Sequence, residues 1–226
     1  MAADQAAGLR RHSARQPARC IQVFSDSPDT AVGLTQALHR HGRTVLLVDT
    51  RGRLFAGSPA RSLFDWRQQL QRGQLQTLPL AYGAGWYAPG VRADEPALSA
   101  VANGYDHVLF DVGWKAELAL LQGAVHTVLM EIPRAARDLN ADEPMLRAYA
   151  VLKTLACMGG AVSVGLLGDR PACDHVRDAG CRFLEQRFAR AIFSLANEDD
   201  AFAALAVRMA DEETSLTAGF NKTGNT

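Results

Sequence analysis

Short apolar runs alternate with amphipathic stretches along most of this chain, and that alternation constrains the fold more than any other feature. The predicted strands are 20–24, 44–49, 75–80, 107–112, 126–132, 161–167 and 190–195. Most are continuously apolar, as in parallel strands that are buried on both faces. The helical patterns between them are 28–41, 60–72, 97–103, 115–122, 141–157, 172–187 and 198–210. We therefore predict an α/β fold with a doubly wound, mostly parallel sheet flanked by helices.

The two ends of the chain differ from its middle in composition. Residues 1–19 carry no aromatic or β-branched side chain, so they can bury little apolar surface. Residues 214–226 are polar and contain glycine. We expect a flexible N-terminal segment over 1–19, one α/β domain over 20–213 and a flexible tail over 214–226.

Composition argues against several functional classes. Lys plus Arg and Asp plus Glu number 24 each, so the net charge of zero gives no drive toward nucleic acid. The four cysteines and six histidines show no metal-ligand spacing, and we predict no metal site. No apolar run approaches the roughly 20 residues of a membrane span. With no signal peptide in the sequence, the four cysteines are expected to be reduced thiols, which predicts a cytoplasmic protein.

The turn after the first predicted strand is Ser25-Asp26-Ser27-Pro28-Asp29. In an open parallel sheet, ligands bind beyond the carboxyl ends of the strands, where this turn, Asp49 and Asp111 are all expected. A phosphate loop there needs glycines and a lysine, but GxxxxGK[ST] occurs nowhere in the chain. Ser27 and Pro28 instead predict a helix N-cap followed by proline at the first helical position.

Three further segments resemble the MinD/ParA-type deviant P-loop ATPases. The pattern Ala37-Leu38, Gly42 and Val45 to Asp49 resembles the end of that family's first helix and its second strand. The stretch YDHVLFD, ending at Asp111, resembles its Walker B strand. A later strand is followed by Pro133 and an Asp-rich helix start, in the family's order. The resemblance covers about residues 20–195 and implies a MinD-like P-loop NTPase fold.

The chain departs from that family at the phosphate loop. Ser27 stands where the phosphate-binding lysine would be, and the family's second, signature lysine has no counterpart. By resemblance, Asp49 matches the aspartate that orients the attacking water, and Asp111 matches the Walker B aspartate on the magnesium side. We interpret Ser27, Asp49 and Asp111 as a vestigial nucleotide site with structural roles, and we assign no catalytic residue and no cofactor.

The N-terminus carries the sequence DQAAGLR, residues 4–10. It resembles the DQAxxLR activation motif of the FlhG branch of the same family, which stimulates the signal-recognition-type GTPase FlhF. The resemblance implies a partner-binding segment whose residues are Asp4, Gln5, Ala6, Leu9 and Arg10. Gly8 costs about 1 kcal/mol of helix propensity relative to alanine, so we expect the free segment to fold only on its partner.

The last predicted helix tests a further property of that family, a basic amphipathic helix that binds membranes. Its apolar stripe is Ala201, Phe202, Leu205, Ala206 and Met209. Acidic residues bracket the helix and would be repelled by an anionic lipid surface, so we expect the stripe to pack on the domain.

These features lead to one hypothesis and two alternatives. The hypothesis is an FlhG-like regulator of flagellar number and placement that has lost ATP binding, binds an FlhF-type GTPase and stimulates its GTP hydrolysis. One alternative is an active MinD-like ATPase that uses Asp49 and Asp111 with Mg²⁺ and ATP. The other is a degenerate MinD-like adaptor for another envelope machine. Homodimer formation, a flagellar partner and recruitment to the cell pole stay open.

Overall fold

The computed structural model describes residues 18–54, 77–78, 92, 96–114, 124, 126–133, 143–159, 162–195 and 200–209. The motif at residues 4–10, the tail at 214–226 and the predicted helices at 60–72 and 115–122 lie outside these ranges. Most of the segment from Pro133 to Asp142 does so too.

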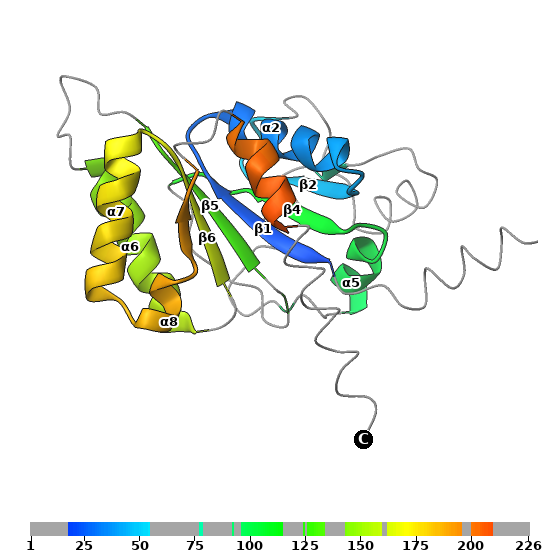
Figure 1. Cartoon of the computed structure of the whole chain (residues 1–226). Helices are drawn as coiled ribbons and strands as arrows, with labels where there is room; N and C mark the ends of the chain where they lie inside the picture. The colour runs from blue at the N-terminus through cyan, green and yellow to red at the C-terminus, as the bar shows by residue number, and fades with distance from the viewer. Residues whose placement is uncertain are drawn as a thin grey trace, which may run out of the picture.

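Within the described ranges, a parallel sheet of seven strands forms the centre of the molecule (Figure 1). The strands are β1 (Arg19–Phe24), β2 (Val45–Asp49), β3 (Thr77–Leu78), β4 (His107–Asp111), β5 (His126–Ile132), β6 (Val162–Gly168) and β7 (Ile192–Ser194). Their order is β3-β2-β4-β1-β5-β6-β7, and every neighbouring pair is parallel. The predicted α/β class and its parallel sheet are confirmed.

Helices cover both faces of this sheet. They are α2 (Pro28–Arg40), α5 (Pro96–Ala102), α6 (Glu143–Met158), α7 (Arg170–Phe183), α8 (Gln186–Ala189) and a C-terminal helix over 201–209. One apolar cluster joins α2 and the C-terminal helix to the sheet, and a second joins α5, α6 and α7 to it. Figure 1 shows α2 beside the C-terminal helix and α6 beside α7.

Some predicted elements differ in extent from the observed ones. The strand predicted at 190–195 is observed as Ile192–Ser194, whereas Thr77 and Leu78, the described residues of the strand predicted at 75–80, are both in β3. The helix predicted at 172–187 ends at Phe183 because Leu184 is extended, with φ −106° and ψ 163°, and a separate short helix follows. Its start is at Arg170, where the Asp169 carboxylate caps the backbone N–H of Ala172.

The C-terminal helix packs its apolar stripe into the domain, as predicted. Leu205, Ala206 and Met209 are buried, and Phe202 lies against Gly33 of α2. The Arg19 guanidinium donates to the Met209 carbonyl oxygen at 3.1 Å and ties the helix end to the start of β1. No helix within the described ranges is both long and apolar enough to cross a membrane.

The strand order places β1 where the chain changes direction across the sheet. From β1 the chain leaves to β2 and returns to β4 on one side, and it then crosses to β5 on the other. The carboxyl ends of β1, β2, β4 and β5 therefore meet at one edge, where an open α/β sheet forms its binding crevice. The first turn, Asp49 and Asp111 all lie there, as the sequence predicts.

Gly168 at the end of β6 provides a test of how closely β6 packs against Ile132 of β5. Its φ of +111° is unfavourable for other residues, and a Cβ atom there would lie 2.2 Å from the Ile132 carbonyl oxygen. We expect Gly168→Ala to lower the free energy of unfolding by about 2–3 kcal/mol in urea denaturation. Gly104→Ala is the control, since a Cβ atom at Gly104 meets nothing within 4 Å. Equal midpoints for the two variants would contradict this account.

Candidate functional site

The first turn is closed by its own hydrogen bonds. The Ser25 hydroxyl oxygen accepts from the backbone N–H of Ser27 at 2.8 Å, and the Ser27 hydroxyl oxygen accepts from the N–H of Asp29 at 3.2 Å. Ser27 is extended and Pro28 occupies the first turn of α2, so the predicted N-cap and proline are confirmed. Ser25 is fully buried beneath the turn.

A carboxylate from β5 reaches this turn from the neighbouring strand. Glu131 Oε2 accepts from the Thr30 hydroxyl at 2.5 Å and also lies in hydrogen-bond contact with the Ser25 hydroxyl. Ser25 and Thr30 are 3.0 Å apart through their hydroxyl oxygens. An internal negative charge thus sits beside the first turn of α2, where the helix dipole favours an anion.

The end of β4 is neutralised by an arginine from the loop after β2. Arg53 Nε donates to Asp111 Oδ2 at 2.7 Å, and Nη2 donates to Oδ1 at 2.5 Å, a bidentate pair. Asp111 is fully buried and the Arg53 side chain is 17% exposed. Hydrogen bonding to Asp111 is the main cause that raises the pKa of Arg53 above its ordinary value, and partial burial opposes that rise.

The same guanidinium also holds the first turn. Arg53 Nη1 donates to the Asp26 carbonyl oxygen at 2.8 Å. Nη2 donates to the carbonyl oxygens of Ser25 at 3.1 Å and Ser27 at 3.3 Å. One side chain therefore joins the end of β4 to the turn between β1 and α2.

Asp49 at the end of β2 shapes the loop that carries Arg53. Its Oδ1 accepts from the backbone N–H groups of Arg51 and Arg53, each at 3.2 Å, and its Oδ2 accepts from that of Leu54 at 2.9 Å. A carboxylate that accepts several backbone N–H groups fixes a tight loop conformation. Asp49 thereby holds the loop in the conformation from which the Arg53 side chain reaches Asp111.

Arg51 of the same loop covers the other side of the turn. It lies 4.0 Å from the Asp26 carboxylate and packs on Gly113, where a Cβ atom would fall 2.3 Å from its Nη1. Gly113 has φ +72°, a conformation that glycine adopts freely.

These contacts do not fit a nucleotide with its magnesium ion. A magnesium ion takes oxygen ligands, but both Asp111 oxygens bond Arg53 and both Asp49 oxygens bond backbone N–H groups. A phosphate beside α2 would meet the carboxylates of Glu131, Asp26 and Asp29. No cluster of three or more metal-ligating side chains occurs within the described ranges.

The structure brings together all three residues that the sequence marked as a vestigial site, Ser27, Asp49 and Asp111. The predicted partner-binding residues Asp4, Gln5, Ala6, Leu9 and Arg10 lie outside the described ranges and stay a prediction. The sequence did not point to Arg53, because no motif or pattern in the neighbouring residues marks it as part of a site. Glu131 did have one, since it is the one charged residue in the apolar strand HTVLMEI.

A further carboxylate in the YD pattern has a structural role at the opposite edge of the sheet. Asp106 Oδ2 accepts from the backbone N–H of Thr44 at 2.7 Å and from its hydroxyl at 2.8 Å. The Asp106 N–H donates back to the Thr44 carbonyl oxygen at 3.0 Å. The starts of β2 and β4 are joined in this way.

No protein-family model and no curated protein sequence matches this chain. A solved structure titled "Partition Protein" aligns over 88% of this chain and 69% of its own, with 15% sequence identity and a TM-score of 0.48. A likeness of this size carries no argument about family or activity. The α/β fold stated above stands on the strand order and pairing of this chain itself.

The Arg53–Asp111 pair gives a direct test of how the site is held. Arg53→Met leaves a buried carboxylate without its partner, so we expect a loss of about 3–5 kcal/mol in the free energy of unfolding. Adding Asp111→Asn should restore much of that loss, because the remaining buried group is then neutral. Urea denaturation of both single variants and the double variant measures the coupling.

The control for this comparison of single and double variants is an exposed ion pair of α6. Arg147 pairs with Glu143 one helical turn away, and both side chains are about half exposed. Arg147→Met should cost only about 0.3–0.5 kcal/mol. If Arg53→Met costs no more than this control, the pair does not hold the site.

Proposed function

We propose that this protein is a catalytically silent, FlhG-like regulator that binds an FlhF-type GTPase and stimulates its GTP hydrolysis, and so sets flagellar number and placement. The observation that carries the proposal is the DQAAGLR motif in a chain whose first turn has no glycine and no lysine. The bidentate contact of Arg53 with Asp111 supports the loss of nucleotide binding. The proposed location is the cytoplasm, with recruitment to the cell pole through the GTPase.

The stimulation is assigned to side chains of the N-terminal segment. Gln5 would lie nearest the partner's nucleotide, where a glutamine amide can orient the attacking water. Leu9 would supply apolar contact, and Asp4 with Arg10 would set the polar register of the segment. The folded domain then contributes no chemistry of its own.

The test is GTP turnover by an FlhF-type GTPase with and without this protein. We expect the full chain to raise the rate and Gln5→Ala to abolish most of the gain, as removal of a water-orienting group typically costs on the order of 10²-fold. Gln16→Ala is the matched control, since Gln16 lies in the same segment outside the motif. An undiminished gain with Gln5→Ala would overturn the proposal.

Loss of nucleotide binding is tested separately by calorimetry with Mg-ATP. We expect no binding tighter than about 100 μM, since about 5–6 kcal/mol is hard to reach where both strand-end aspartates are already bonded. The titration is repeated with ADP and with Mg²⁺ alone. Tight binding of Mg-ATP would instead favour an active ATPase that displaces Arg53 from Asp111.

A further inference from the structure

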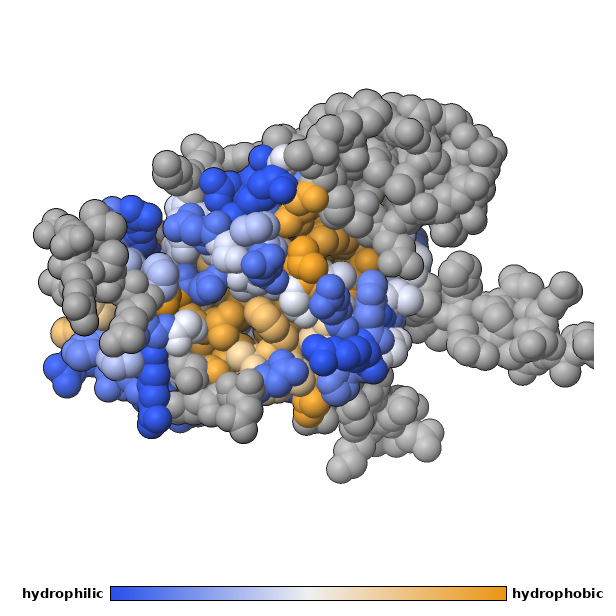
Figure 2. All heavy atoms as spheres, turned by 90° about the horizontal axis from the view of Figure 1, so that it is seen from above, coloured by the Kyte–Doolittle hydropathy of each residue, from blue (hydrophilic) through white to orange (hydrophobic). Residues whose placement is uncertain are grey.

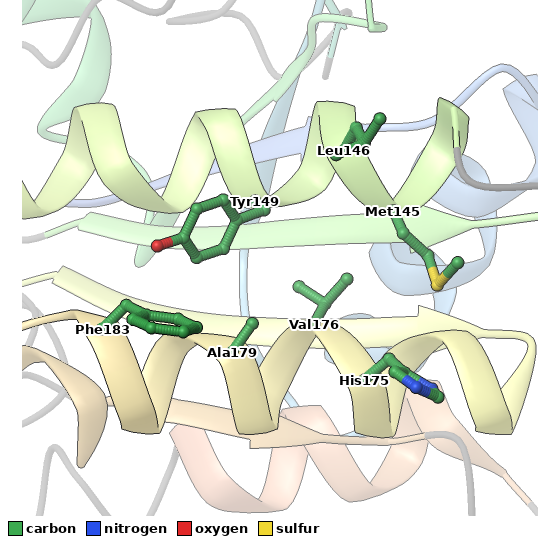
Figure 3. A pocket seen from close by; sticks show the side chains of 7 residues that line it. All are labelled: Met145, Leu146, Tyr149, His175, Val176, Ala179 and Phe183. Atoms are coloured by element: carbon green, nitrogen blue, oxygen red, sulfur yellow. The ribbon is translucent and has the colours of Figure 1, made fainter.

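An apolar groove runs between α6 and α7 on the outer surface of the domain. Figure 3 shows side chains from the two helices pointing into it. Its volume is about 470 Å³, and its walls include Met145, Leu146 and Tyr149 from α6 with Val176 and Phe183 from α7. The groove lies away from the Arg53–Asp111 site, which is at the carboxyl edge near β1.

The apolar side chains that line this groove are unusually exposed for the described surface. Figure 2 shows apolar residues gathered across the middle of the face seen from above, and exposed apolar surface by itself is ordinary for a folded protein. Leu146 and Phe183, however, are 65% and 68% exposed and stand on one groove. Contiguous apolar surface of this kind marks a place where another segment binds.

Several charged side chains of α6 and α7 pair with one another. Arg147 pairs with Glu143 on α6, and on α7 Arg170 and Arg177 both pair with Asp174. These internal pairs leave apolar contact as the main means of recognition. A helix with one apolar face fits a groove between two helices.

The start of the described chain lies on the same side of the sheet as this groove. Ala18 packs against the apolar cluster that contains Val176 and that Met145 also contacts. Since α6 and α7 connect parallel strands, their carboxyl ends lie at the edge where β1 begins. Phe183, the last residue of α7, therefore marks the end of the groove closer to Ala18.

The segment before Ala18 is long enough to reach the groove. β6 is two strand positions from β1, a spacing of roughly 10 Å. Residues 1–17 span about 25 Å as a helix and up to roughly 56 Å when extended. Met209, the last described residue, lies instead in the cluster on the α2 face of the sheet.

We propose that residues 1–17 dock in the groove between α6 and α7 of their own chain, with Leu9 as the inserted side chain. Leu9 is the one branched apolar side chain in that segment. Docking withholds the DQAAGLR motif from a partner, so release from the groove would regulate stimulation. This regulatory consequence rests on the proposed function, whereas the docking itself does not.

Limited proteolysis of the full chain tests the docking without any partner. Trypsin cleaves after Arg10, Arg11 and Arg15, and mass spectrometry gives the rate at each. We expect Leu146→Ser with Phe183→Ser to raise these rates by roughly tenfold or more, as expected when a leucine loses its apolar contacts. Leu9→Ser in the otherwise unchanged chain should give the same increase.

The control is Val207→Ser, which removes an exposed apolar side chain from the opposite face and should leave the rates unchanged. Unchanged rates in the groove variant would overturn the proposal. So would faster cleavage after Lys222 alone, which would place the C-terminal segment in the groove. Protection that grows with protein concentration would also overturn it, since a second copy would then be the occupant.

A second measurement separates this inference from the proposed function. If both hold, the groove variant stimulates the GTPase more strongly than the unmodified chain at equal concentration. If cleavage accelerates in the groove variant while no form of the protein changes GTP turnover, the docking stands and the proposed function is wrong.

Discussion

The buried carboxylate of Asp111 is the constraint on which the rest of this edge depends. It lies at the end of a central strand with no exposed surface, so an ionised group there requires a partner. Arg53 supplies that partner, and its remaining N–H groups bond the carbonyl oxygens of the first turn. The loop after β2 therefore has to pass over the end of β4, and Asp49 holds it in that path.

Two internal charges lie at this edge of the sheet, where open α/β sheets bind their ligands. Arg53 is the positive charge beside Asp111, and it bonds both carboxylate oxygens that a metal ion would need as ligands. Glu131 is the negative charge beside α2, where a phosphate would otherwise bind. Each is held by several hydrogen bonds, so a ligand must break a group of contacts rather than enter an open cleft.

The sequence predicted the parts of this structure that depend on local pattern. Continuous apolar runs identified the strands, and Ser27 followed by Pro28 identified the start of α2, because both signals lie within a few residues. Arg53 could not be found in this way, because its partners Asp111 and Ser25 lie far from it in the sequence, at the ends of other strands. Leu184 shows the same limit, because the break after Phe183 interrupts a helical pattern and no glycine or proline stands at Phe183, Leu184 or Glu185 to mark it.

A site filled by its own side chains changes how such a protein can be regulated. A nucleotide alters a protein only through different affinities for two states, so the proposed loss of nucleotide binding would remove that means of control. Under that proposal, control would come from an equilibrium within the chain or from a partner. The groove between α6 and α7 offers such an equilibrium, since its apolar walls are exposed and Ala18 enters the fold on the same face. A few kcal/mol of apolar contact there would suffice to keep the N-terminal segment mostly bound yet available to a competing partner.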